Sequence, residues 1–127
     1  MALVIVADDD VLHREFVETV LRRAGHRVYP SRNGDECLKH MQTLGTGNVD
    51  VVITDIFMPE ADGVEVSIEI CSSFPDVPVI GMTGGRYGVD NQYGRSLKRL
   101  GAASILYKPF SANDLLQAID ELSHESE

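Results

Sequence analysis

The chain has 127 residues, 43% of them hydrophobic, and a formal net charge of −9 from 20 Asp and Glu against 11 Lys and Arg. This length and composition suit one domain with one core, and no stretch approaches the roughly 20 apolar residues that span a bilayer. Without a dense cluster of Lys and Arg or a basic leader, we expect a cytoplasmic domain that binds neither nucleic acid nor membrane.

Strand-like and helix-like segments alternate along the chain. Apolar runs predict strands at residues 3–7, 27–29, 49–54, 77–82 and 104–107. Helical spacing of apolar residues and capping signals predict helices at residues 11–24, from Asn33, at 63–73, at 89–100 and from Ser111. Five such units predict a single α/β domain over residues 1–122 with a polar tail at 123–127. The expected architecture is a doubly wound, flavodoxin-like (βα)5 parallel sheet with strand order 2-1-3-4-5.

The first predicted helix indicates which residues should face the core. Its apolar residues recur at helical spacing, at Leu12, Phe16, Val17, Val20, Leu21 and Ala24. This spacing predicts one apolar face that includes Leu12. His13 lies one turn into the same helix, and we interpret it as solvent-exposed helix surface.

Asp55 follows the most informative apolar run of the chain. Four of the six residues at 49–54 are apolar β-formers, which is typical of a strand buried on both faces of a parallel sheet. Pro59 and Asp62-Gly63 predict an ordered turn beyond it. The Asp55 carboxylate is therefore expected at the carboxyl end of a central strand, where open α/β sheets bind their ligands.

Other strand ends carry further reactive groups. Asp8 and Asp9 follow the first strand, Thr83 the fourth and Lys108 the fifth, and the predicted strand order brings these ends to one rim with Asp55. Crowded carboxylates resist joint ionisation unless a cation lies among them, and oxygen-only ligands favour Mg²⁺. An aspartate can attack phosphorus to form an acyl phosphate, and a metal, an ammonium and a hydroxyl can neutralise the transferring oxygens. The rim is thus predicted to be a site of phosphoryl chemistry.

With these residues in place, the chain resembles the receiver domain of bacterial two-component response regulators over essentially its whole length, in the stand-alone form of a chemotaxis regulator. The matching pieces are Ile5-Val6-Ala7-Asp8-Asp9-Asp10, Asp55-Ile56-Phe57-Met58-Pro59-Glu60-Ala61-Asp62-Gly63, Thr83 after an apolar strand, and Gly101-Ala102 leading to Lys108-Pro109-Phe110. Each piece alone is weak, but four in the correct order at the correct strand ends are specific. The resemblance implies that Asp55 accepts a phosphoryl group from the phosphohistidine of a histidine kinase.

The resemblance also implies roles for the other residues of the rim. It implies a Mg²⁺ site formed by three carboxylates and one backbone carbonyl, those of Asp8, Asp9, Asp55 and Phe57. Lys108 would pair with the phosphoryl group, and Thr83 would move toward it to report phosphorylation. Asp10 would be an N-terminal helix residue, favoured there by the helix dipole.

One position departs from the usual receiver pattern, and two further features of the chain carry expectations of their own. Receivers commonly place Tyr or Phe three residues before the lysine, but this chain has Ile105 there and Tyr107 directly before the lysine. A switch that pairs a threonine with an aromatic side chain is therefore in doubt. The glycine-rich residues 84–88 suggest a mobile loop, and the resemblance implies a cis peptide bond between Lys108 and Pro109.

We therefore expect a phosphorylation-dependent switch that modifies only itself and is not an enzyme acting on other molecules. Its expected partners are a histidine kinase or histidine phosphotransfer protein and an unknown downstream protein, because no output domain follows residue 122. One alternative is a receiver excised from a longer regulator or hybrid kinase. Another is a phosphatase of the haloacid-dehalogenase type, although that family needs a second Asp where this chain has Phe57. A flavodoxin-like FMN binder and a pseudo-receiver are the remaining alternatives.

Overall fold

The computed structural model describes residues 2–45, 47–56, 68–70, 72–84 and 102–125. Five strands form one parallel sheet: β1 (Leu3–Ala7), β2 (Arg27–Ser31), β3 (Val51–Asp55), β4 (Val79–Gly84) and β5 (Ser104–Lys108). Three helices lie within the described residues from end to end: α1 (Val11–Arg23), α2 (Gly34–Leu44) and α5 (Ala112–Glu125). The strand order is β2-β1-β3-β4-β5, which confirms the predicted topology.

Several predictions fall on other parts of the chain. Of the helix predicted at 63–73, residues 68–70 and 72–73 are described and are helical. The helix predicted at 89–100, the glycine-rich residues 85–88 and Phe57 lie outside the described residues. Helix α5 continues to Glu125, past residue 122 at which the sequence suggested that the domain ends.

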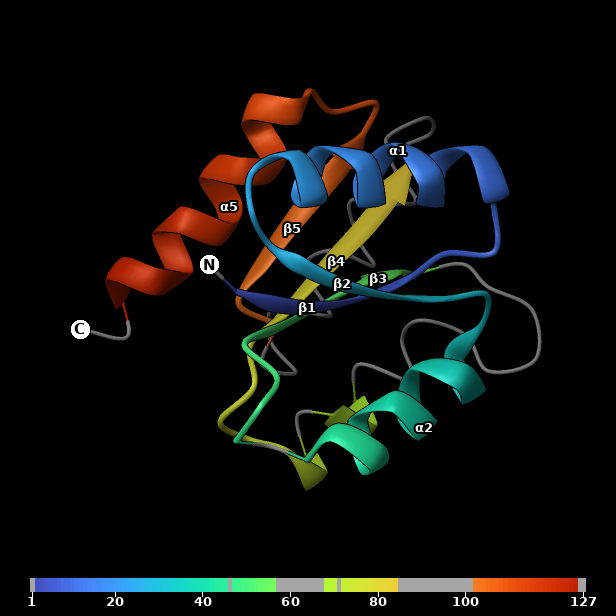
Figure 1. Cartoon of the computed structure of the whole chain (residues 1–127), viewed down its shortest axis with the longest axis vertical. Coiled ribbons are helices and arrows are strands. Elements are labelled where there is room, and N and C mark those ends of the chain that lie inside the picture. Colours follow the sequence, from blue (N-terminus) through green and yellow to red (C-terminus); the bar gives the residue numbers. More distant parts are fainter. Residues whose placement is uncertain (1, 46, 57–67, 71, 85–101, 126–127) are drawn as a thin grey trace.

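The sheet lies between two layers of helices. Helices α1 and α5 cover one face and α2 covers the other (Figure 1). Alternate residues of a strand point to opposite faces, so Val4 and Val6 pack beneath α1 and α5 while Ile5 and Ala7 pack beneath α2. All five residues of β3 are buried, as expected for a central strand covered on both faces.

Side-chain caps determine where each helix begins relative to the sheet. Asp10 accepts hydrogen bonds from the backbone N–H groups of Leu12 and His13 at 3.0 and 3.3 Å, so α1 begins immediately after the β1 end. Ser111 and Asp114 cap each other's backbone N–H groups at the start of α5. These caps confirm the expected helix starts after the first and fifth strands.

The predicted apolar face of α1 needs one correction. Val17 and Leu21 are fully buried, but Leu12 is 78% exposed and Phe16 lies at the surface. Residues 8–10 alone link β1 to α1, so the first turn of α1 lies at the carboxyl edge of the sheet. Little of the sheet lies beneath this turn, and its apolar side chains remain uncovered.

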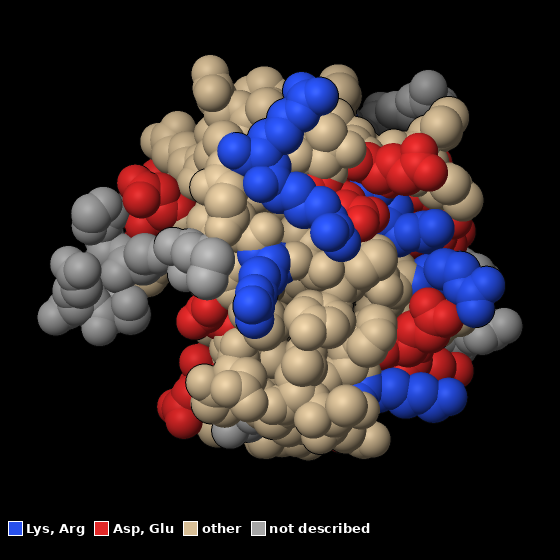
Figure 2. Space-filling model, viewed as in Figure 1, with Lys and Arg blue, Asp and Glu red and all other residues tan. Residues whose placement is uncertain are grey.

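Charged side chains of both signs share the face seen in Figure 2, although the whole chain is acidic. Two ion pairs join residues four positions apart in sequence, Arg22 with Glu18 at 2.8 Å and Arg32 with Glu36 at 3.0 Å. Such exposed pairs contribute little to stability. None of the described helices is long and apolar enough to cross a membrane.

Candidate functional site

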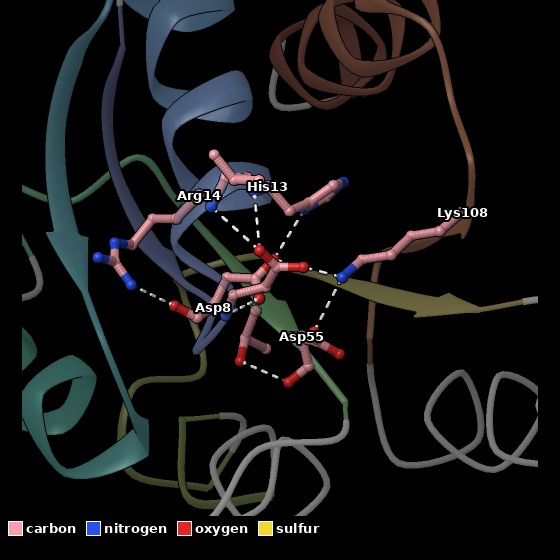
Figure 3. A network of polar contacts seen from close by, with 8 residues as sticks. Asp8, His13, Arg14, Asp55 and Lys108 are labelled. Carbon is pink, nitrogen blue, oxygen red and sulfur yellow. Dashed lines mark hydrogen bonds and ion pairs between the residues drawn. The ribbon is translucent and has the colours of Figure 1, made fainter.

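The carboxyl ends of the strands bring the predicted rim residues together. Asp8 follows β1, Asp55 is the last residue of β3, and Lys108 is the last residue of β5. Their side chains point toward one another at this edge of the sheet (Figure 3). Parallel pairing places β3 next to β1 and β4 next to β5, so residues far apart in sequence meet within one site.

Three carboxylates form the acidic part of this site. One ligand oxygen from each of Asp8, Asp9 and Asp55 lies within 4.8 Å of the other two. Asp8 is fully buried and Asp55 nearly so, whereas Asp9 is exposed and opens the cluster to solvent. A set of hard carboxylate oxygens with access to water fits Mg²⁺, which binds one or two carboxylates and retains several waters. The carboxylates expected to hold the cation are thus close enough together to share one.

Lys108 supplies the positive charge at this site. Its Nζ donates hydrogen bonds to Oδ2 of Asp55 at 2.9 Å and to Oδ2 of Asp8 at 3.3 Å. Burial alone would lower the pKa of Lys108, but its hydrogen bond to Asp55 and the charges of Asp55 and Asp8 raise the pKa above the usual value. The ammonium therefore stays charged between two carboxylates. The Lys108–Pro109 peptide bond is cis, as predicted.

Asp8 is held by several donors in addition to Lys108. Its Oδ1 accepts from the backbone N–H of Asp10 at 3.0 Å, and its Oδ2 lies 2.7 Å from Nδ1 of His13. Burial raises the pKa of the Asp8 carboxyl, but the hydrogen bonds from His13 and Asp10 and the charge of Lys108 outweigh it and hold the pKa below its usual value. The buried carboxylate is therefore ionised at neutral pH.

Thr83 lies within β4 at the same edge of the sheet and is fully buried. Its hydroxyl oxygen has no hydrogen-bond partner among the residues that the structure describes. The neighbouring strand offers a contrast, because the equally buried Thr54 donates from Oγ1 to the backbone carbonyl of Asp55 at 3.0 Å. A buried hydroxyl without a partner is costly, so Thr83 is suited to accept a new interaction.

The interpretation of His13 as exposed surface is wrong. Its side chain is 20% exposed and contacts Asp8 directly. Helical side chains lean toward the helix N-terminus, so a residue in the first turn of α1 lies over the strand end that precedes it. That geometry, together with the short link between β1 and α1, was the signal in the sequence. Arg14 was also missed, and its Nη1 donates to the backbone carbonyl of Asp8 at 2.8 Å.

Ile105 and Tyr107 both lie on β5. Ile105 stands three residues before the lysine, where receivers commonly have Tyr or Phe. Ile105 is half-buried and packs against Ile56 and Ala102. Tyr107 is exposed. Ile105 therefore packs against Ile56, the residue that follows Asp55 in sequence, and it has no ring or hydroxyl group.

The doubly wound parallel sheet carries an acidic cluster and a lysine at its carboxyl edge, so one site offers oxygen ligands to a cation and a positive charge to an anionic group. The chain matches the family model described as the response regulator receiver domain over residues 4–120, and it belongs to this family. The match does not favour the phosphatase alternative.

Individual relatives agree with the family match. The chain is 32% identical over 120 residues to the sensor kinase CckA of Brucella abortus, a match that covers 94% of this chain and 12% of that protein. It is 29% identical to the response regulator receiver protein CpdR of the same organism, covering 96% of this chain and 97% of CpdR. A receiver domain crystal structure from Clostridium thermocellum superposes with a TM-score of 0.91 at 28% identity, covering 99% and 97% of the two chains.

Proposed function

We propose that this chain is a phosphorylation-dependent signalling switch of a two-component system, with Asp55 as the phosphoacceptor. The observation that carries the proposal is the contact between Asp55 and Lys108 at 2.9 Å, beside a carboxylate cluster with Asp8 and Asp9. A nucleophilic carboxylate, a fixed ammonium and a place for a divalent cation are the parts that phosphoryl transfer to an aspartate needs.

The proposed reaction transfers one phosphoryl group from a phosphohistidine. An Oδ atom of Asp55 forms a bond to phosphorus while the bond from phosphorus to the imidazole nitrogen breaks, and the imidazole leaves with the electron pair. Lys108 balances the negative charge of the phosphoryl oxygens. Mg²⁺, when bound by Asp8, Asp9, Asp55 and, as the family resemblance implies, the carbonyl of Phe57, would neutralise further charge on those oxygens.

The proposed readout begins at Thr83. Its buried hydroxyl gains a hydrogen-bond partner if it moves toward the phosphoryl group, and Lys108 changes partners at the same time. A phosphoryl group that makes these contacts in one conformation shifts the population toward it. Because Ile105 has no hydroxyl or ring, we propose that β4 and the residues that follow it carry the change more than a rotation of the Ile105 side chain does.

The proposed phosphodonor is a histidine kinase or a histidine phosphotransfer protein. Such a partner must bring its phosphohistidine to the carboxyl edge of the sheet, where the first turn of α1 exposes Val11 and Leu12. Exposed apolar side chains beside a reactive site are typical of a protein contact surface. The downstream target is a further protein that the sequence does not name, and the cytoplasmic location and the absence of nucleic-acid binding stay predictions.

The switch would act on itself and not on other molecules as an enzyme. We propose residues 1–122 as the receiver domain. Because the chain spans 12% of the length of CckA, a receiver within a longer regulator or hybrid kinase stays the alternative to a stand-alone protein.

The proposal is tested by phosphorylation with a small phosphodonor such as acetyl phosphate and Mg²⁺, followed by intact-mass measurement. The wild-type protein should gain one phosphoryl group and Asp55→Asn should gain none. Asp35→Asn, which changes an exposed carboxylate of α2, is the matched control and should be labelled as the wild type is. Label retained by Asp55→Asn would contradict the assignment, and turnover of p-nitrophenyl phosphate would favour the phosphatase alternative instead.

A further inference from the structure

We infer that His13 is a positioning residue for this site: its imidazole holds the buried Asp8 carboxylate in the orientation needed to bind the cation. The inference rests on the proposed function, because it assigns a role within the proposed Mg²⁺ site. It concerns a residue of α1 that the sequence pattern placed on the surface.

The contact between the two side chains is short and sheltered. Nδ1 of His13 lies 2.7 Å from Oδ2 of Asp8, which is fully buried. An ionised carboxylate can only accept hydrogen bonds, so Nδ1 carries the proton and donates it to this bond. A charge-assisted hydrogen bond in a buried site is among the stronger polar contacts that a side chain makes.

Packing fixes the orientation of the imidazole independently of Asp8. The His13 and Phe110 rings form a T-shaped contact with 5.3 Å between centroids and an interplanar angle of 89°, and the His13 ring centroid lies 5.9 Å from that of Phe16. Phe16 belongs to α1, whereas Phe110 lies in the segment between β5 and α5. The imidazole is therefore held by two elements on its apolar sides and directs its Nδ1–H at Asp8. The ring contacts and the hydrogen bond to Asp8 are separate contributions of this side chain, and substitutions can remove one without the other.

His13 and Lys108 share one oxygen atom of Asp8. Lys108 lies 3.3 Å from the same Oδ2, and it also binds Asp55. In the proposed reaction Lys108 turns to the phosphoryl group, which removes one donor from a fully buried carboxylate. The bond from His13 and the backbone N–H of Asp10 remain, so Asp8 keeps a donor on each oxygen. Because His13 remains bonded to Oδ2 of Asp8, this oxygen keeps a hydrogen-bond donor when Lys108 moves to the phosphoryl group.

A purely structural role for His13 makes a different prediction, and two substitutions separate the roles. His13→Leu keeps an apolar side chain of similar size against Phe16 and Phe110 but removes the donor. His13→Asn loses the ring contacts but places an amide nitrogen close to the position of Nδ1. If the hydrogen bond matters, the asparagine variant keeps the function, whereas if packing matters the leucine variant keeps it.

The test measures Mg²⁺ binding by isothermal titration calorimetry and, separately, phosphorylation rates from acetyl phosphate at increasing Mg²⁺. We expect His13→Leu to weaken Mg²⁺ binding about tenfold, the lower end of the range for loss of a hydrogen bond to a metal ligand. The Mg²⁺ concentration for half-maximal rate should rise by the same factor, with the rate at saturating Mg²⁺ little changed. His13→Asn should bind Mg²⁺ within a factor of about three of the wild type.

His26→Leu is the matched control. His26 is also a half-buried histidine, but its Nδ1 accepts from the backbone N–H of Ala2 at the opposite edge of the sheet. It should leave Mg²⁺ binding unchanged. Equal Mg²⁺ affinity in His13→Leu and wild type would overturn the inference, as would weakened binding in His13→Asn with normal binding in His13→Leu. A wild-type protein that binds no Mg²⁺ would overturn the proposed metal site and this inference together.

Discussion

Lys108 and Asp55 stand 53 residues apart in sequence, yet Nζ of the lysine lies 2.9 Å from Oδ2 of the aspartate. The contact exists because β3 and β5 lie on either side of β4 in one parallel sheet and end at the same edge. An ammonium in contact with the proposed phosphoacceptor lowers the cost of placing several carboxylates together. In the unphosphorylated protein, Lys108 therefore already holds Asp55 and Asp8 together, and the same residue is proposed to pair with the phosphoryl group.

Replacing Lys108 by methionine should destabilise the protein. The change leaves a fully buried Asp8 and a nearly buried Asp55 without their shared cation, and we expect a loss of about 1–3 kcal/mol in the free energy of unfolding. Urea denaturation measures this loss, and added Mg²⁺ should recover part of it by binding the folded state. Lys39→Met, at an exposed position on α2, should change stability by less than about 0.5 kcal/mol. Equal stability of the two variants would contradict this role for Lys108.

The stability of the protein should fall in acid partly through Asp8. Folding lowers the pKa of Asp8, so its contribution is complete above the pKa of the unfolded chain, about 4, and is lost as the pH falls through the lower folded value. Folding raises the pKa of Lys108, so the lysine contribution persists throughout this range. Urea unfolding of wild type and Asp8→Asn from about pH 7 down to pH 2 should show a steeper decline for the wild type. Parallel declines would mean that Asp8 is not the responsible group.

Two buried threonines on adjacent strands should respond oppositely to the same substitution. Thr54→Val removes a hydroxyl that donates to the Asp55 carbonyl and should cost about 1 kcal/mol. Thr83→Val removes a hydroxyl that makes no hydrogen bond to any residue in the described ranges, so stability should be unchanged or higher. Thermal or urea unfolding of both variants checks the pair. A Thr83→Val variant as destabilised as Thr54→Val would show that the Thr83 hydroxyl is already engaged before phosphorylation.

A phosphoryl mimic should act on the β4–β5 side of the domain. We expect beryllofluoride with Mg²⁺ to change amide hydrogen exchange at Thr83 and over residues 102–108, because Thr83 and Lys108 would make the new contacts. Amides of α2 serve as an internal control, since α2 packs under the opposite sheet face and makes none of these contacts. Changes confined to α2 would mean that this receiver signals through another face.

The sequence determined the sheet and most of the site. Strands buried on both faces must be continuously apolar, so the polar ends of β1 and β3 are conspicuous, and Asp8 and Asp55 were found there. Lys108 was found at the end of the shorter apolar run of β5, an edge strand. A parallel sheet brings such ends to one edge, so the position of each residue along the chain sufficed to predict that they meet.

Only the tertiary structure decided the burial and the partners of α1. Its apolar spacing gave no sign that Leu12 would be exposed, because the spacing does not say where the sheet beneath the helix ends. The packing of the His13 ring depends on Phe110, which lies 97 residues further along the chain in the segment between β5 and α5. Local sequence determines which face of a helix is apolar, but the neighbours that cover a side chain come from segments remote in sequence. The short link between β1 and α1 indicated that His13 lies near the strand end, but only the tertiary structure shows that its ring packs against Phe110 and that its Nδ1 contacts Asp8.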